Sequence, residues 1–209
     1  MANRVISNRD ETVPLFNSPW LDRLTHVHPV TPLVLYLPVV AYFAYRGAVT
    51  LPWYFFLLCF FGGALLWTFA EYWIHRGIFH YEPKSSWGQR LHFLIHGVHH
   101  AYPRDSTRLV MPPVVSIPLA VLFYFLFQWL FGTYQPAVFA GFVLGYVIYD
   151  SIHYATHHWP MRGRIGRFLK AHHMRHHYVD DSRSFGISTP LWDWVFGTYQ
   201  PADSVARRK

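Results

Sequence analysis

Long uncharged stretches dominate the hydrophobic pattern of this 209-residue chain. Residues 47–70 contain no Asp, Glu, Lys or Arg, and neither do residues 109–149. A helix that spans a bilayer needs about 20 predominantly apolar residues, so the second stretch is long enough for two helices. The turn-like sequence Gly132-Thr133-Tyr134-Gln135-Pro136 divides that stretch. We therefore predict four membrane-spanning helices, near residues 30–45, 50–72, 112–131 and 137–153.

Individual residues inside these helices refine the prediction. The first helix is short and carries two prolines, Pro32 and Pro38. Gly141 and Gly145 form a GxxxG motif in the fourth helix, which predicts close helix packing. Cys59 lies within the second helix and is the only cysteine, so we expect no disulfide within the chain.

The composition favours a membrane protein over a soluble protein with buried helices. Hydrophobic residues make up 52% of the chain and charged residues only 14%, whereas roughly a quarter of a soluble domain is charged. Uncharged runs of this length are typical of helices in lipid. The first 30 residues are polar and lack the apolar core of a signal peptide, so we expect no such peptide.

The net charge of +7 follows the predicted topology rather than a nucleic-acid interface. Of the 18 Lys and Arg residues, only Arg46 falls on the far side of the predicted helices. The others lie before the first helix, between the second and third, or after the fourth, which places them on one membrane face. The positive-inside rule makes this face cytoplasmic. We therefore expect cytoplasmic termini and no nucleic-acid partner.

Ten of the fifteen histidines form four clusters on that same face. The clusters are His75/His80, His96/His99/His100, His153/His157 and His173/His176/His177. The pattern HxxHH is expected about 0.08 times by chance under random placement, yet it occurs twice. Neutral imidazole is the commonest protein ligand for metals, and ten histidines are too many for one ion. The clusters therefore predict a site for two metal ions.

Helical spacing explains how the clusters can serve two ions. Residues three and four apart lie on one face of a helix, so the members of each HxxHH motif can project together. Adjacent residues diverge by about 100° around a helix. The neighbours His99 and His100 can then contact different ions, and so can His176 and His177.

Two carboxylates near the helix ends are candidate supporting groups. Glu71 lies one turn before His75, and Asp150 lies three residues before His153. Because a carboxylate at a membrane-helix end is costly and usually functional, we expect both to accept hydrogen bonds from ligand imidazoles. The remaining five histidines stay outside the predicted ligand set: His26, His28, His92, His158 and His172.

Longer strings around the clusters resemble one enzyme family. They are EYWIHRGIFH (71–80), LHFLIHGVHH (91–100), RLVMPP (108–113), YDSIHYATHH (149–158), LKAHHMRHHY (169–178) and FGISTPLWDWVFGTY (185–199). These strings resemble the fatty acid 2-hydroxylase family, within the fatty acid hydroxylase and sterol desaturase superfamily. The resemblance covers roughly residues 14–199 and corresponds to the catalytic domain without a cytochrome b5 domain.

The resemblance implies an all-α integral membrane fold with four transmembrane helices and a cytosolic helical cap over a dimetal centre. In this interpretation residues 1–209 form one domain, with an N-terminal interfacial segment (1–29), a cap from residues 75–110 and 154–200, and a basic tail (201–209). By analogy with the family, the first ion would be bound by His75, His80, His96, His100 and His176, and the second by His99, His153, His157, His173 and His177. No catalytic residue beyond these ligands is implied.

The implied reaction is the O2-dependent hydroxylation of C2 in a long acyl chain, free or in a sphingolipid. Such chemistry needs a redox metal, and zinc has a filled d shell, so we expect two iron ions. Zinc can replace iron in purified protein because it binds imidazole sites more tightly. An external electron donor is needed, either a cytochrome b5-like protein or a ferredoxin with its reductase. The membrane would be a bacterial inner membrane or the endoplasmic reticulum.

Other interpretations stay open at this point. A desaturase, or a carotenoid or sterol hydroxylase, would use the same dimetal centre on another lipid. A metal transporter would instead place its polar ligands near the bilayer midplane, whereas these clusters lie at helix ends. A zinc hydrolase typically has three protein ligands and an open position. For a lipid hydroxylase, aromatic residues could line a substrate tunnel: Trp73, Phe79, Tyr81, Trp192 and Trp194.

Overall fold

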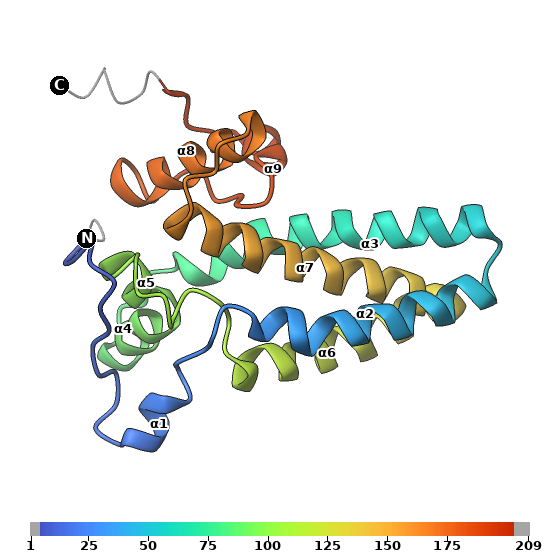
Figure 1. The fold of residues 1–209 in the computed structure, drawn as a ribbon, viewed down its shortest axis with the longest axis horizontal. Coiled ribbons are helices and arrows are strands. Elements are labelled where there is room, and N and C mark those ends of the chain that lie inside the picture. Colours follow the sequence, from blue (N-terminus) through green and yellow to red (C-terminus); the bar gives the residue numbers. More distant parts are fainter. Residues whose placement is uncertain (1–4, 203–209) are drawn as a thin grey trace.

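The computed structural model describes residues 5–202, and within this range every regular element is a helix (Figure 1). The α-helices are α1 (Pro19–Arg23), α2 (Thr31–Thr50), α3 (Trp53–Ile74), α4 (Ser86–His92), α5 (Val98–Ala101), α6 (Pro113–Phe131), α7 (Gln135–His158), α8 (Arg164–Tyr178) and α9 (Leu191–Val195). Two π-helical turns, η1 (His75–Phe79) and η2 (Phe93–Gly97), and one 3-10 turn, η3 (Gly132–Tyr134), complete the elements of this range.

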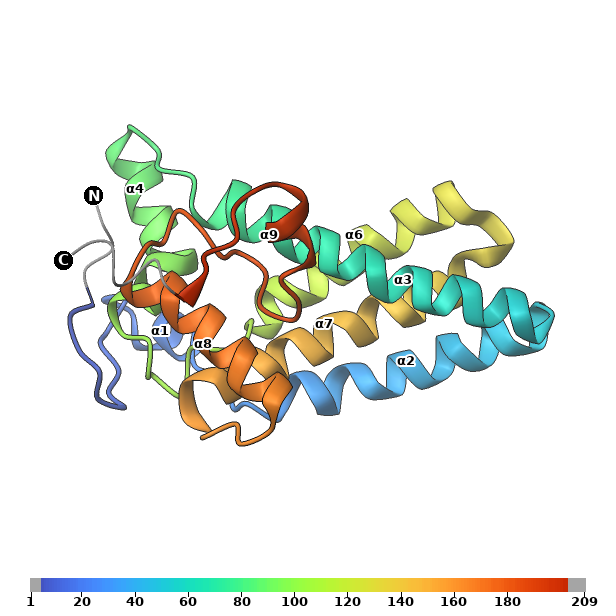
Figure 2. The same cartoon turned by 90° about the horizontal axis from the view of Figure 1, so that it is seen from above.

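Four long helices form an elongated bundle, and the short helices gather at one of its ends (Figures 1 and 2). Helix α7 packs against α2, α3 and α6, and most of its residues are buried. Helices α4, α5, α8 and α9 lie at the end where α3 and α7 finish. The fold thus brings segments that are far apart in sequence to one end of the bundle.

Three stretches are long and apolar enough to cross a membrane: Thr31–Thr50, Trp53–Phe79 and Pro113–His158. The third stretch includes both α6 and α7, which fold back on each other through η3 (Figure 1). Large apolar side chains point away from the bundle, among them Leu58 (67% exposed) and Trp129 (80% exposed). An exposed apolar surface of this kind is typical of helices surrounded by lipid.

Two helices extend further than the sequence pattern predicts. Helix α2 continues past residue 45 to Thr50, and α7 continues past residue 153 to His158. The residue that follows each helix precedes a proline, Leu51 before Pro52 and Trp159 before Pro160. Both of these residues have extended backbone, because the proline ring disfavours helical backbone in the residue before it.

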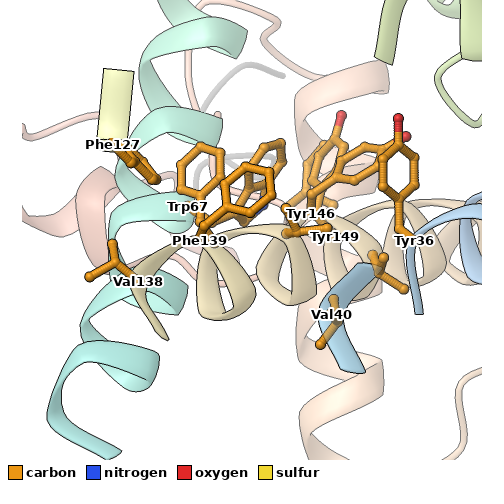
Figure 3. Packing of buried hydrophobic residues seen from close by; sticks show 12 residues of the cluster. Tyr36, Val40, Trp67, Phe127, Val138, Phe139, Tyr146 and Tyr149 are labelled. Carbon is orange, nitrogen blue, oxygen red and sulfur yellow. The ribbon is translucent and has the colours of Figure 1, made fainter. Parts of the chain in front are cut away.

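The centre of the bundle is aromatic (Figure 3). The ring of Trp67 contacts the rings of Phe142 and Tyr146 edge-on, with both centroids at 5.2 Å. The hydroxyl of Tyr36 donates to Ser116 Oγ at 2.8 Å. Each edge-to-face aromatic pair stabilises the fold by about 0.5–1.5 kcal/mol in addition to the hydrophobic free energy of burying the rings. These contacts connect α2, α3, α6 and α7.

Glycines allow α3 and α7 to pack backbone against backbone. A Cβ atom on Gly141 would overlap the Phe60 carbonyl oxygen, and one on Gly63 would overlap the Val138 carbonyl oxygen. A Cβ on Gly145 would meet the Trp67 side chain at 2.6 Å. The close packing that the GxxxG motif predicts is confirmed, and Gly63 contributes to it from the facing helix.

The N-terminal segment lies against α5 and the loop that follows it. Ile6 N donates to Ala101 O at 2.8 Å, and Val27 N donates to Thr107 O at 2.7 Å. Within the described part of the predicted interfacial segment, residues 5–29, helix forms only at Pro19–Arg23. Of the predicted basic tail (201–209), residues 203–209 lie outside the described residues, as do residues 1–4 of the interfacial segment.

Candidate metal centre

The ten clustered histidines meet in two groups of five at the end of the bundle. One group contains His75, His80, His96, His100 and His176, and the other contains His99, His153, His157, His173 and His177. Within each group, one ring nitrogen per histidine lies within 4.8 Å of the others. Nine of the ten are buried, and His80 is partly exposed. These are the same two groups that the family resemblance implied, so we call them the His75 group and the His99 group.

A π-helical turn brings His75 and His80 together. In an α-helix, residues five positions apart point about 140° away from each other. The turn η1 instead pairs His80 N with His75 O at 3.1 Å, an i to i−5 hydrogen bond. The two Nε2 atoms then lie 3.3 Å apart. The HxxxxH spacing is therefore the sequence signal of this turn. An α-helix brings together residues three or four positions apart, so α-helical spacing alone does not predict that His75 and His80 meet.

The ring nitrogens of the His75 group converge at short distances. His96 Nε2 lies 3.2 Å from both His75 Nε2 and His80 Nε2. His100 Nε2 lies 2.9 Å from His96 Nε2 and 3.2 Å from His176 Nε2. The Phe79 ring stacks on the His96 imidazole, with centroids 4.9 Å apart.

The His99 group has the same compact arrangement. His99 Nε2 lies 2.9 Å from His153 Nε2, which α7 carries. His173 Nε2, on α8, lies 2.9 Å from His157 Nε2 and 3.1 Å from His177 Nε2. The His99 ring also contacts the His157 and His177 rings at 4.8 and 4.6 Å between centroids. This group therefore joins α5, α7 and α8.

Hydrogen bonds on the far side of two rings determine what the converging nitrogens can do. His75 Nδ1 lies 2.6 Å from Phe185 O, and His176 Nδ1 lies 2.7 Å from Arg183 O. A carbonyl oxygen only accepts, so both Nδ1 atoms carry the proton in the neutral imidazole and both Nε2 atoms present lone pairs. Two nitrogens that each lie about 2.1 Å from a shared metal ion, at adjacent coordination positions, are about 3 Å apart. The Nε2 atoms within each histidine group have separations of this size. The donor set therefore fits a metal ion in each group.

Burial keeps the imidazoles of the short helices neutral. Desolvation lowers the pKa of His99 well below its ordinary value, and the neighbouring His153 and His157 lower it further. Desolvation also lowers the pKa of His176 to about 4, although the Arg183 carbonyl opposes this shift. The His173 pKa falls well below its ordinary value for the same primary reason. These histidines present lone pairs rather than charge at neutral pH, as metal ligands must.

Acid should destabilise the metal-free protein. The unfolded chain binds a proton at His176 near pH 6.5, whereas the folded chain does so only near pH 4. Unfolding therefore takes up protons between these values, and stability falls as pH falls through the window. Between pH 7 and pH 5, His176 alone would contribute about 2 kcal/mol to this loss. Thermal unfolding of metal-stripped protein at pH 7 and pH 5 measures it. We expect a smaller shift for His176→Gln, and equal midpoints at both pH values would contradict the prediction.

The two predicted supporting carboxylates bind other partners. Glu71 Oε1 accepts from Ile187 N at 2.5 Å and from Ser188 N at 2.9 Å, and Glu71 Oε2 accepts from Ser188 Oγ. Asp150 Oδ2 accepts from Met111 N at 3.3 Å. Within residues 5–202 neither carboxylate is hydrogen-bonded to an imidazole, so these bonds differ from the partners that the sequence predicts. The buried backbone amides of residues 187 and 188 compete for Glu71, because an unpaired buried amide is costly.

Asp193 is a buried carboxylate beside the site that is not among the residues predicted from the sequence. It is fully buried, and it accepts hydrogen bonds from Phe185 N and Gly186 N, each at 2.8 Å. Burial alone would raise the pKa of Asp193, but hydrogen bonds from His172, Thr198 and Gly186 hold it below its ordinary value. The available signal was an acid inside the aromatic run LWDWV, where an uncompensated charge would be costly.

The other histidines and the predicted tunnel residues occupy varied positions. His92 Nε2 donates to Phe79 O at 2.6 Å, and His172 bonds Asp193, so both lie beside the site. His26 bonds Asp22 and Thr107 in the N-terminal segment. Of the five aromatic residues, only Phe79 contacts rings of the ten histidines within the described chain. Tyr81 and Trp194 are exposed, which does not fit a tunnel wall.

An apolar cavity lies between the long helices. It has a volume of about 40 Å³. Its lining comes from all four helices and from the segment before α6, and includes Tyr36, Trp67, Ile74, Met111, Phe123 and Tyr146. Ile74 directly precedes His75 in the chain. None of the ten clustered histidines lines the cavity, and it is far smaller than a long acyl chain.

Comparisons with known proteins point to one family. The model of the fatty acid hydroxylase family matches residues 60–198. Dihydroceramide fatty acyl 2-hydroxylase FAH1 from Arabidopsis thaliana is 41% identical over 148 residues, which cover 70% of this chain and 62% of that protein. Fatty acid 2-hydroxylase from Mus musculus is 45% identical over 146 residues, which cover 68% of this chain and 39% of that protein.

The fold of this chain is also similar to that of a solved structure. The structure described as full-length scs7p with only the hydroxylase domain visible superimposes with a TM-score of 0.83 at 38% sequence identity. The match covers 88% of this chain and 71% of that chain. The chain thus spans most of that solved chain but only 62% and 39% of the two curated relatives.

Proposed function

The chain belongs to the fatty acid hydroxylase family, and on that premise we propose that it is an O2-dependent di-iron lipid hydroxylase. Its reaction would insert a hydroxyl group at C2 of a long-chain fatty acyl group, free or in a sphingolipid. The names of the relatives, fatty acid 2-hydroxylase and dihydroceramide fatty acyl 2-hydroxylase, support both the position and the substrate class.

The observation that carries the proposal is the pair of five-histidine groups. Two bound iron ions would supply the oxidising chemistry for O2, while an external donor would provide the two electrons, with two protons, that the release of the second oxygen atom as water requires. Imidazole is a suitable ligand for iron, and it also binds zinc. All ten ligands would be neutral imidazoles. The ligands themselves would therefore bring no negative charge to the metal ions.

Side chains around the two groups would orient the ligands and exclude water. The carbonyls of Arg183 and Phe185 orient the rings of His176 and His75. The Phe185 ring packs against His75, His80 and His176, with centroids 5.4 to 5.7 Å away. Phe79 covers His96. An apolar wall of this kind keeps water from competing with a lipid substrate.

We place the site at the cytoplasmic membrane face. Four membrane crossings, by α2, α3, α6 and α7, are supported by the antiparallel arrangement of α6 and α7 (Figure 1). Residues 75–110 and 154–200 would then form the cytosolic cap of a single domain. The apolar cavity beside Ile74 is too small for a long chain, so we propose that the acyl substrate reaches the site from the lipid leaflet.

The reaction also needs electrons from a partner protein. We propose a separate cytochrome b5-like protein, or a ferredoxin with its reductase, as the donor. The exposed face of α8 is a basic surface on an element of the site, because Arg164 and Arg167 are exposed on the helix that carries His173, His176 and His177. Electrostatic steering of an acidic partner toward such a surface would speed association.

Mass spectrometry of lipids from a host that lacks 2-hydroxy acyl chains would test the function. The wild-type chain, expressed with isotopically labelled O2, should yield acyl groups that carry one labelled oxygen at C2. Loss of two hydrogens without added oxygen would instead show a desaturase, and oxygen on a carotenoid or sterol would show another hydroxylase. Metal flux into proteoliposomes without O2 consumption would support a transporter and overturn the enzyme proposal.

A further inference from the structure

The segment of residues 183–188, between α8 and α9, contacts only one of the two histidine groups. Its carbonyls at Arg183 and Phe185 accept the Nδ1 hydrogen bonds of His176 and His75, at 2.7 and 2.6 Å. Its Phe185 ring contacts three imidazoles, and all three belong to the His75 group. Within residues 5–202, none of its hydrogen bonds or ring contacts reaches the His99 group.

Two buried carboxylates hold this segment from behind. Asp193 accepts from the amides of Phe185 and Gly186, each at 2.8 Å. Glu71 accepts from the amides of Ile187 and Ser188, at 2.5 and 2.9 Å. Four consecutive amides are thus bonded to two carboxylates, while two carbonyls of the same segment face the histidines. The bonds to the ionised Asp193 are charge-assisted, and such bonds are roughly twice as strong as neutral ones.

Asp193 is itself held in place on every side. Its Oδ1 also accepts from Thr198 Oγ1 at 2.7 Å, and its Oδ2 accepts from His172 Nε2 at 3.1 Å. The His172 ring lies between the Phe168 and Tyr199 rings, with centroids 6.1 and 5.5 Å away. An ionised carboxylate has about four lone-pair positions that can accept hydrogen bonds, and these four bonds occupy them. An asparagine could accept only part of this set, and its NH2 would face a donor.

Steric contacts leave the segment little freedom to adjust. A Cβ on Gly186 would overlap the Thr189 carbonyl oxygen and would lie 3.0 Å from Asp193 Oδ2. Ser184 has a positive φ of 60° and is fully buried, and its amide donates to Thr198 O at 2.9 Å. The geometry of the two orienting carbonyls therefore depends on the bonds that Asp193 makes.

The structure assigns to Asp193 the role of a positioning residue for the metal site of the His75 group, acting through residues 183–188. This inference rests on the proposed function, in which each histidine group binds one ion. Groups that orient ligand imidazoles typically contribute 10- to 100-fold to metal affinity. The Asp193→Asn variant should therefore bind the ion of the His75 group about 10- to 100-fold more weakly and leave the ion of the His99 group unchanged.

Zinc titration of the metal-free, full-length protein in detergent would test this inference, with a chromophoric chelator as competitor. The wild type should bind two Zn²⁺ ions. Combining Asp193→Asn with a histidine variant assigns the weakened site. His153→Ala removes a ligand of the His99 group, so the double variant should have lost or weakened both sites. His96→Ala affects the same group as Asp193→Asn, so that double variant should keep one tight site.

Asp105→Asn is the matched control, because Asp105 is a buried carboxylate that accepts from Thr107 N at 3.0 Å and lies outside both groups. It should bind both ions as the wild type does. Two unchanged sites in Asp193→Asn would overturn the inference, and so would equal weakening of both sites, which a general structural role predicts. If Asp193→Asn does not fold, Thr198→Val removes one hydrogen bond from Asp193 and must show a smaller loss at the same single site. A wild type that binds no ions would overturn the proposed function instead.

Discussion

A chain in which His99 is replaced by alanine is expected to form no 2-hydroxy acyl lipid above the background of its host. His99 Nε2 lies 2.9 Å from His153 Nε2, and the His99 ring contacts three other imidazoles of its group. Removing the ring leaves a hole among buried donors and deletes one of five ligands. Changes to groups that only orient ligands cost 10- to 100-fold in affinity or activity, so we expect a loss of at least about 100-fold.

Lipid mass spectrometry and the metal content of the purified protein measure this effect together. His99→Ala should retain one ion of the two, because the His75 group keeps all five of its histidines. His28→Ala is the matched control, since His28 is an exposed histidine outside both groups and should preserve product and metal. Equal amounts of 2-hydroxy acyl lipid from the wild type and His99→Ala would contradict the proposed chemistry.

Replacing Gly63 by leucine is expected to prevent the bundle from assembling. A Cβ at this position would overlap the Val138 carbonyl oxygen on α7, and a backbone atom in a packed helix cannot rotate aside as a side chain can. Overpacking of a core typically costs 1–3 kcal/mol, and contact with backbone should raise the loss to about 3 kcal/mol or more. Close approach at small residues is also a main source of helix association in lipid.

The adjacent glycine provides the control. A Cβ on Gly62 would meet no heavy atom within 4 Å, so Gly62→Leu should fold and retain its thermal unfolding midpoint. Size-exclusion chromatography in detergent and thermal unfolding compare the two variants. Equal stability of Gly62→Leu and Gly63→Leu would show that α3 and α7 do not pack as they do in this structure.

The sequence predicted the end of a helix correctly where a local backbone feature terminates that helix. The third predicted helix (112–131) matches α6 (Pro113–Phe131), because the positive φ of Gly132 ends it. The ends predicted near residues 45 and 153 were too early. His153 and His157 are polar but remain helical, because their partners lie across the site rather than in water.

The candidate site was predictable in part. Clustering and spacing identified ten histidines, and the divergence of adjacent residues predicted that His99 and His100 would fall in different groups, which they do. Spacing did not predict the π-helical turn that joins His75 to His80. It also assigned Glu71 to an imidazole, although Glu71 bonds amides that lie 116 and 117 residues later in the chain.

The sequence by itself determined the local properties of this protein. Apolar runs define where the long helices form, glycines define where two of them can touch, and histidine spacing defines which side chains can share a helix face. Only the tertiary structure decided which nitrogens meet, and that Asp193 and Glu71 hold the segment behind His75 and His176. The physical reason is that a hydrogen bond depends on distance in space, and these partners are far apart in the chain.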